Sequence, residues 1–129
     1  MIRGRFSGFK MIFHGVDLIE IGRIERALKR WGEKFLSRIY REEEVGRVEE
    51  LAARFAAKEA TIKALGMRVP FRDIEVRNDR RGKPFIMLHG KALRRAKELG
   101  IRRWEISLSH SRELAIASVI GVGDEAHNI

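Results

Sequence analysis

Residues 54–66 (RFAAKEATIKALG) belong to the longest helical pattern of the chain, which runs from residue 42 to residue 65. Glutamates lead this pattern, as suits a helix N-terminus, and Gly66 is a common C-cap residue. Small side chains would let the helix pack closely on its neighbours: Ala56, Ala57, Ala60 and Ala64. Glu59 and Lys63 are four residues apart and therefore lie on one face. Such a pair is most often a surface ion pair, but the same face would suit a glutamate that binds a cation beside a lysine that contacts a phosphate.

The segments around this helix alternate between strand and helix patterns. An apolar, β-branched run predicts a first strand at residues 11–19 (MIFHGVDLI), and helical stripes follow at residues 24–31 and 35–40. Farther along, alternating segments on either side of a turn predict two hairpins with a short basic helix between them. The hairpin strands are expected at residues 73–78, 84–88, 104–109 and 114–122, and the helix at residues 91–99.

This order of elements predicts the fold class. A strand, helices, a hairpin, a helix and a second hairpin are typical of an α+β protein with a mainly antiparallel sheet, here with one long helix. A length of 129 residues favours a single small domain. We expect the domain at residues 11–123, after an N-terminal extension at residues 1–10 and before a flexible tail at residues 124–129.

The composition narrows the classes of function. The chain has no cysteine, which excludes disulfides, thiolate zinc sites and a cysteine nucleophile. Its net charge of +9 predicts attraction to nucleic acid, an anionic membrane, a phosphorylated small molecule or an acidic protein. No apolar run approaches the roughly 18 residues of a membrane span, and residues 1–10 lack the apolar stretch and cleavage site of a signal peptide. We therefore expect a cytoplasmic protein that does not enter a membrane.

Three further features could carry chemistry. Asp17 lies in a strand pattern, where a carboxylate either faces solvent at the strand end or binds a hard cation. Residues 78–84 (NDRRGKP) are either a simple charged hairpin turn or a weak phosphate loop. In residues 107–111 (SLSHS), Ser109 and His110 point to opposite faces of a strand, which disfavours a hydrolase, whereas His110 could contact a phosphate. None of these features decides the function singly.

Their combination and order resemble the holo-acyl-carrier-protein synthase family, the small bacterial type within the 4′-phosphopantetheinyl transferase superfamily. Four segments carry the resemblance: GVDLIEI at residues 15–21 with Arg23 and Ile24, RFAAKEA at 54–60 with KALG at 63–66, DIEV at 73–76 with GKP at 82–84, and SLSH at 107–110. The resemblance spans residues 11–122. The chain departs from the pattern in its N-terminal extension and in Val16 and Leu18, where the family often has isoleucines.

The resemblance implies a magnesium-dependent enzyme that moves 4′-phosphopantetheine from coenzyme A to a serine of an apo-acyl carrier protein and releases adenosine 3′,5′-bisphosphate. It implies that Asp17 and Glu59 bind Mg²⁺, together with the pyrophosphate of coenzyme A and water, and that Lys63 neutralises developing phosphate charge. Either Glu59 or a metal-bound water would deprotonate the serine. Gly82, Lys83 and Pro84 would border the adenine nucleotide, and His110 would approach its phosphates.

The resemblance also implies the partners. Carrier proteins of this kind are acidic, so the basic residues of the first helix, Arg23, Arg26 and Arg30, would dock the carrier. The family further implies a homotrimer with active sites between subunits. Two alternatives remain open: a small basic nucleic-acid-binding protein, supported by the charge of +9, and a non-catalytic oligomer that only binds coenzyme A. We expect no nucleic acid partner, because the sequence lacks the common binding fingerprints.

Overall fold

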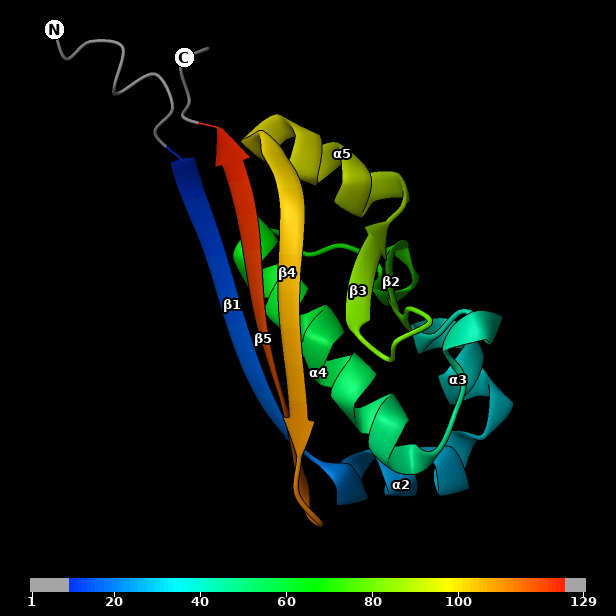
Figure 1. The fold of residues 1–129 in the computed structure, drawn as a ribbon. Coiled ribbons are helices and arrows are strands. Elements are labelled where there is room, and N and C mark those ends of the chain that lie inside the picture. Colours follow the sequence, from blue (N-terminus) through cyan, green and yellow to red (C-terminus); the bar gives the residue numbers. More distant parts are fainter. Residues whose placement is uncertain (1–9, 125–129) are drawn as a thin grey trace, which may run out of the picture.

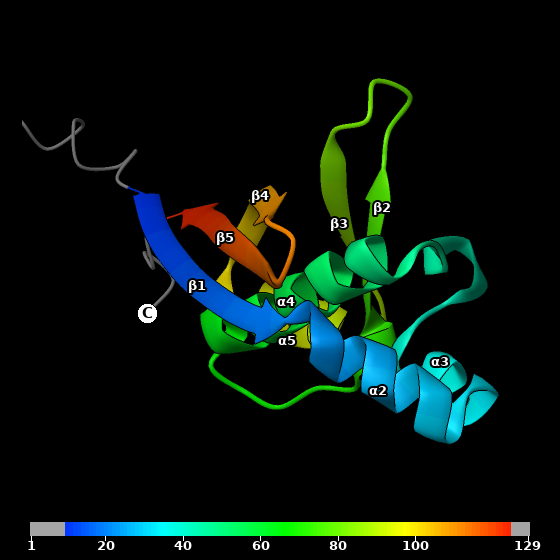
Figure 2. The same cartoon turned by 90° about the horizontal axis from the view of Figure 1, so that it is seen from below.

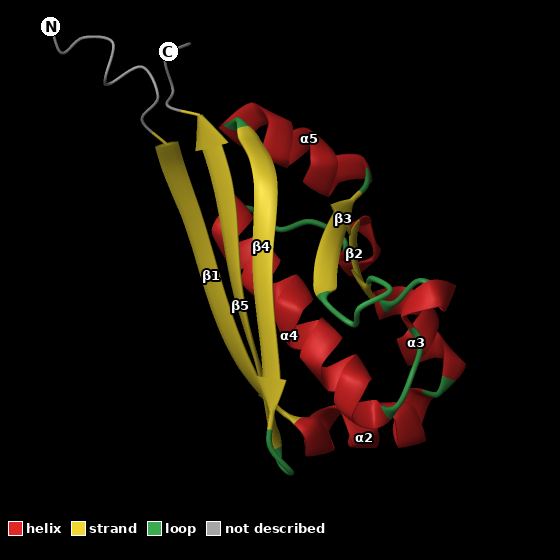
Figure 3. Cartoon of the chain, in the orientation of Figure 1, coloured by secondary structure: helices red, strands yellow, loops and turns green. Residues whose placement is uncertain are grey.

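The computed structural model describes residues 10–124, which form two packed layers (Figure 1). One layer is an antiparallel three-stranded sheet in the order β1-β5-β4, made of β1 (Lys10–Glu20), β5 (Leu114–Asp124) and β4 (Ile101–His110). The long helix α4 (Val48–Leu65) crosses one face of this sheet and supplies much of the second layer (Figure 3).

A second, two-stranded sheet of β2 (Ile74–Asn78) and β3 (Pro84–Leu88) lies beside β4. Helices α2 (Ile21–Trp31) and α3 (Glu33–Ile39) follow β1 at one end of the molecule, and α5 (Gly90–Leu99) joins β3 to β4. Figure 2 shows the turn of the β2–β3 hairpin projecting away from α2 and α3. The β2–β3 hairpin and the β4–β5 hairpin belong to separate sheets.

The crossing of β1 over α4 depends on Gly15. A β-carbon at this position would lie 1.8 Å from the carbonyl oxygen of Ala60 and 3.1 Å from the backbone nitrogen of Ala64. Only a residue without a side chain lets the strand approach the helix backbone this closely. Ala56, Ala57 and Ala60 are fully buried, so the small residues of α4 do allow close packing, as their pattern predicts.

Helix α4 begins at Val48, so the prediction of a helix from residue 42 is wrong at its N-terminus. Residues 42–44 form a 3₁₀ turn instead, because the Glu44 side chain folds back to accept a hydrogen bond from the backbone nitrogen of Arg41 at 2.7 Å. The α-helix starts after Arg47, whose backbone nitrogen donates to Glu50 Oε1 at 2.9 Å. The leading glutamates therefore divide between a buried contact and a helix cap.

A buried ion pair connects the 3₁₀ turn at residues 42–44 to α4. The Lys58 ammonium and the Glu44 carboxylate are both fully buried, with Nζ 2.9 Å from Oε2. Lys58 also donates to the carbonyl oxygens of Phe71, at 3.1 Å, and Ile74. Glu44 Oε2 accepts a further hydrogen bond from the backbone nitrogen of Val76 at 2.8 Å. Burial lowers the pKa of the Lys58 ammonium, and the Glu44 carboxylate opposes that shift.

The predicted α+β class with antiparallel pairing is confirmed, and most element bounds shift by a few residues. The strand expected at residues 104–109 extends over Ile101–His110. Lys10 pairs with Asp124 across β1 and β5, so both strands exceed their expected limits. Residues 1–9 of the expected extension and 125–129 of the expected tail lie outside the described residues. Within residues 10–124, no helix has both the length and the apolar composition of a membrane span.

Candidate active site

Asp17 and Lys63 meet where β1 passes over α4. Asp17 follows Gly15 by two residues and therefore projects from the same face of the strand, toward the helix. The Lys63 ammonium lies 3.2 Å from Asp17 Oδ1 and donates a hydrogen bond to the carbonyl oxygen of Val16 at 2.9 Å. Because β1 is an edge strand of the sheet, this contact lies at the border of the molecule rather than in its core.

Glu59 lies one helical turn before Lys63 and has a cationic partner of its own. Its Oε1 atom is 3.0 Å from Nη1 of Arg68, a residue in the loop that follows α4. The Asp17 and Glu59 side chains are 19% and 25% exposed, whereas their partners Lys63 and Arg68 are 57% and 68% exposed. The site thus holds two half-buried carboxylates, each paired with a solvent-facing cation.

Asp17 and Glu59 have the donor chemistry that Mg²⁺ requires. Magnesium usually takes one or two protein carboxylates and completes its octahedron with phosphate oxygens and water. In residues 10–124, no three His, Cys, Asp or Glu side chains form a group that could hold a metal. Two carboxylates, one paired with Lys63 and one a helical turn before it, therefore fit a cation that is shared with a phosphorylated substrate better than an all-protein metal cage.

The predicted nucleotide-binding turn lies elsewhere in the molecule. Asp79 Oδ1 accepts hydrogen bonds from the backbone nitrogens of Arg81 and Lys83, at 2.8 and 2.9 Å, and Gly82 has a φ of 86°. Asn78 donates to the Gly82 carbonyl at 2.8 Å. This turn belongs to the β2–β3 hairpin, and β5 and β4 lie between that hairpin and β1.

The turn is tied to α4 through Arg54. Nη2 of Arg54 donates to Asn78 Oδ1 at 2.9 Å, and Arg54 also donates to the Glu44 carbonyl. Pro84 opens β3 and is partly buried. The segment RFAAKEA thus contains Arg54, which positions the hairpin turn, and Glu59, which lies on the side of α4 with Lys63. The sequence alone does not reveal that these two residues serve different places.

His110 ends β4 and is exposed, with its Nδ1 atom 3.2 Å from the carbonyl oxygen of Ser111. It pairs with Ala115, whereas Asp17 pairs with Ala117 on the same strand β5. His110 therefore lies near the level of Asp17 but two strands away, about 10 Å at usual strand spacing. A single copy of the chain brings Asp17 into contact with Lys63, with Glu59 one helical turn away on α4, and leaves His110 and the hairpin turn apart from them.

The expected docking arginines line a basic groove on α2. Arg23, Arg26 and Arg30 are all exposed, and the groove beside them has a volume of about 440 Å³. Its apolar lining is formed by Ile19, Ile24, Ala27, Trp31, Phe35 and Phe55. The Arg30 guanidinium lies 5.1 Å from the centre of the Trp31 ring. Because α2 continues directly from β1, this groove begins two residues beyond Asp17.

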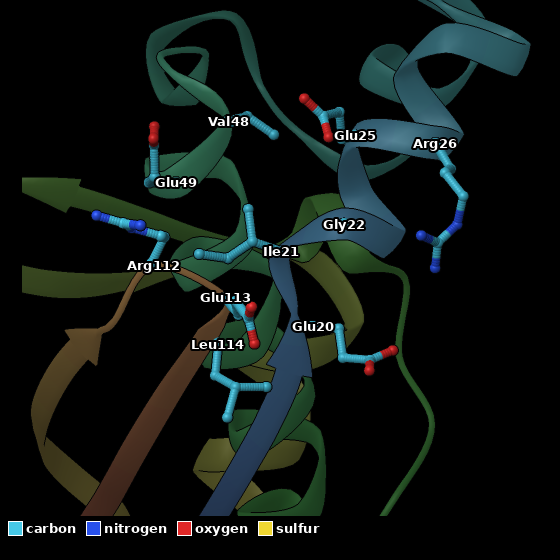
Figure 4. Close-up of a pocket in the computed structure, with 10 residues that line it drawn as sticks. All are labelled: Glu20, Ile21, Gly22, Glu25, Arg26, Val48, Glu49, Arg112, Glu113 and Leu114. Carbon is cyan, nitrogen blue, oxygen red and sulfur yellow. The ribbon is translucent and has the colours of Figure 1, made fainter.

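A larger cavity, of about 660 Å³, opens where β1 passes into α2 and β5 begins (Figure 4). Four glutamates and two arginines contribute to its lining: Glu20, Glu25, Glu49, Glu113, Arg26 and Arg112. Figure 4 shows Ile21 among these charged side chains and Leu114 next to Glu113. Asp17, Glu59 and Lys63 do not line this cavity, so the chemistry of the residues, and not volume, identifies the candidate site.

Comparison with known proteins identifies the family of the chain. Residues 14–117 match the model of the 4′-phosphopantetheinyl transferase superfamily. The holo-[acyl-carrier-protein] synthase of Herpetosiphon aurantiacus is 51% identical and covers 88% of this chain and 100% of its own. The holo-ACP-synthase structure from Plasmodium yoelii has a TM-score of 0.80 at 31% identity, covering 90% of this chain and 98% of that one. The Helicobacter pylori synthase in complex with coenzyme A has a TM-score of 0.76 at 32% identity, covering 86% and 99%.

The chain belongs to the 4′-phosphopantetheinyl transferase superfamily. Within that superfamily it is a transferase of the holo-[acyl-carrier-protein] synthase kind, since its curated relatives and its structural neighbours share that name. Family membership thus decides between the functions that the sequence left open, in favour of the enzyme over the nucleic-acid-binding protein.

Proposed function

We propose that this chain transfers the 4′-phosphopantetheine group of coenzyme A to a serine of an apo-acyl carrier protein, with Mg²⁺ as its cofactor. The observation that supports the proposal is the Asp17–Lys63 ion pair at 3.2 Å, with Glu59 one helical turn before Lys63 on α4. The relatives are named for this reaction, and solved synthases of 28–38% identity include complexes with coenzyme A or with ADP.

Asp17 and Glu59 would hold the metal, which would polarise the diphosphate of coenzyme A and stabilise the charge on the leaving group. The serine oxygen of the carrier forms a bond to the β-phosphorus, the bond from that phosphorus to the bridging oxygen breaks, and adenosine 3′,5′-bisphosphate leaves. Lys63 lies where it can neutralise charge that develops on the phosphate oxygens. Glu59 or a water molecule at the site would accept the serine proton.

The groove on α2 supports the proposed carrier dock. An acidic carrier helix would pair its carboxylates with Arg23, Arg26 and Arg30 and lay its apolar side chains over Trp31. Charge pairing of this kind raises the rate of encounter and fixes the orientation of the partners. Because the groove begins near Asp17, a docked carrier would present its serine close to the proposed metal site.

The outer face of the sheet supports the proposed homotrimer. Five large apolar side chains project from β1 and β5 on the face opposite α4 and are 39–59% exposed: Ile12, Val16, Leu18, Leu114 and Ile116. Leu18 and Ile116 are direct partners across the two strands. An apolar face of this kind favours contact with another copy of the chain. A neighbouring copy could then supply the His110 and hairpin-turn contacts that one copy leaves apart. The cytoplasmic location stays a prediction.

Mass spectrometry of an apo-acyl carrier protein tests the proposal directly. After incubation with this protein, coenzyme A and Mg²⁺, we expect the carrier to gain one phosphopantetheinyl group on its serine. The same mixture with excess chelator should leave the carrier unmodified, and added Mg²⁺ should restore the reaction. An unmodified carrier under all conditions would contradict the transfer, whereas full modification in chelator would contradict the role of the metal alone.

A further inference from the structure

Arg68 contacts the same carboxylate that the proposed mechanism assigns to the metal. Its Nη1 atom lies 3.0 Å from Glu59 Oε1, within hydrogen-bonding distance. Glu59 is the less exposed partner at 25%, and Arg68 reaches it from the solvent side. A positive side chain therefore occupies one oxygen of a proposed metal ligand.

The surrounding loop holds Arg68 in place. Gly66 ends α4 with a φ of 66° and donates its backbone nitrogen to the Ile62 carbonyl at 3.0 Å, which turns the chain back along the helix. Beyond it, the Arg68 guanidinium lies 5.7 Å from the centre of the Phe71 ring. Phe71 is fixed in turn, since its ring packs 5.3 Å from that of Phe55 and its carbonyl accepts a hydrogen bond from buried Lys58.

Both proposed metal ligands are thus neutralised by the protein itself. Asp17 pairs with the Lys63 ammonium, which also donates a hydrogen bond to the Val16 carbonyl. Glu59 pairs with the Arg68 guanidinium. A divalent cation that approaches Glu59 meets the repulsion of the Arg68 guanidinium, and at Oε1 the two cations would compete for the same lone pairs. The phosphates of coenzyme A would offer the Arg68 guanidinium another anion to pair with.

We propose that Arg68 is a positioning residue that orients Glu59 and competes with the divalent cation for it. The competition weakens metal binding before coenzyme A arrives and is relieved when the diphosphate becomes the partner of Arg68. The inference rests on the proposed metal role of Glu59. Before coenzyme A arrives, Arg68 acts only through that carboxylate.

Titration of the substrate-free protein with Mn²⁺, followed by the electron paramagnetic resonance signal of the free ion, tests the competition without any turnover. Arg68→Gln should bind Mn²⁺ about two- to fivefold more tightly than the wild type, the range expected for loss of one exposed ion pair. Arg68→Lys keeps a positive charge beside Glu59 and should stay within about twofold of the wild type. Thermal unfolding checks that both variants fold.

Arg102→Gln is the matched control. Arg102 is 71% exposed and pairs with a carboxylate at 3.2 Å, but that carboxylate is Asp124, at the far end of β5 from the Asp17 row. This variant loses the same charge as Arg68→Gln does. Its Mn²⁺ affinity should equal that of the wild type within experimental error, because Arg102 is farther from the proposed metal site than the screening length.

The outcomes separate the inference from the function on which it rests. Tighter binding by Arg68→Gln alone supports the competition. Equal or weaker binding by Arg68→Gln, with a wild-type site that Glu59→Gln abolishes, overturns the inference and leaves the metal site intact. A wild-type affinity that Glu59→Gln does not change overturns the metal assignment and the inference together.

Discussion

Lys58 and Glu59 are neighbours in the chain, yet their surroundings differ completely. Lys58 is fully buried and bonded to the Glu44 carboxylate and to two backbone carbonyls. Glu59, one residue later, faces a half-exposed site and pairs with solvent-facing Arg68. Breaking a buried pair leaves an uncompensated charge in the core, whereas an exposed pair contributes little to stability. Adjacent residues of α4 thus have different roles: Lys58 stabilises the fold, and Glu59 belongs to the candidate site. Substitutions at the two positions should therefore have different effects on stability and activity.

Lys58→Met should produce the largest loss of stability. The substitution leaves the Glu44 carboxylate buried without its cation, which costs about 3–5 kcal/mol of unfolding free energy. Urea denaturation followed by circular dichroism measures this loss. Lys63→Met is the matched control on the same helix, since Lys63 is 57% exposed, and it should change stability by less than about 1 kcal/mol.

A double variant keeps this prediction testable if Lys58→Met does not fold. Replacing both partners, in Glu44→Leu with Lys58→Met, removes the buried charge and should recover part of the stability. Recovery cannot be complete, because Glu44 also accepts hydrogen bonds from the backbone nitrogens of Arg41 and Val76. Equal stability of the Lys58→Met and Lys63→Met variants would show that the two lysines do not differ as the structure indicates.

Glu59→Gln should show the opposite behaviour. We expect transfer to the carrier to fall by about a hundredfold or more, because a neutral amide is a poor ligand for Mg²⁺. The free energy of unfolding should change by less than about 1 kcal/mol, since the lost pair with Arg68 is exposed. Initial rates of carrier modification and a denaturation curve on the same sample measure both quantities.

Glu98→Gln provides the control for Glu59→Gln. Glu98 also pairs with an arginine, at 3.2 Å from Arg95, but it lies on α5 and is 64% exposed. Its variant should retain wild-type transfer rates. If Glu59→Gln transfers phosphopantetheine as fast as Glu98→Gln does, Glu59 is not a metal ligand in this reaction.

The contrast between Lys58 and Glu59 also marks the limit of what the sequence predicts. The helical pattern, the alternating hairpin strands and Gly66 locate most elements, because periodicity and turn residues act locally. Residues 42–44 look like the start of a helix for the same local reason. That Glu44 instead turns inward to Lys58 depends on β2, which lies about 30 residues later, and no local pattern contains this contact.

The candidate site shows a similar division. The spacing of Glu59 and Lys63 predicts that they share a helix face, but only the resemblance to a family joined Asp17 to them. The structure adds the reason for this contact, since Gly15 lets β1 lie against α4. Arg68 was missed entirely, because its role depends on the path of the loop after Gly66 rather than on any motif.

Gly15→Ala tests whether that close approach holds the site together. The added β-carbon would meet the Ala60 carbonyl, so strand and helix must move apart at a cost of about 1–3 kcal/mol. Asp17 moves with the strand, so transfer activity should fall together with stability. Gly22→Ala is the control, because its β-carbon meets only the flexible end of Arg26 at 3.1 Å, and its stability should be unchanged or slightly higher.

Equal melting temperatures of the Gly15→Ala and Gly22→Ala variants would contradict the close packing of β1 on α4. A Gly15→Ala variant that is less stable but fully active when folded would instead show that the position of Asp17 tolerates a shift of the strand. Stability and activity therefore need to be measured on both variants.

The smallest expected effect lies outside the paired carboxylates, on α2. Arg23→Glu should raise the KM for the carrier by about tenfold and leave the KM for coenzyme A unchanged, because Arg23 lines the groove and contacts neither carboxylate of the site. Arg94→Glu reverses another exposed charge, on α5, and should change neither value. The effect of Arg23→Glu should shrink as salt is added, since screening weakens charge pairing between solvated surfaces. Equal changes in both KM values would place Arg23 in the nucleotide site and leave the carrier without its proposed dock.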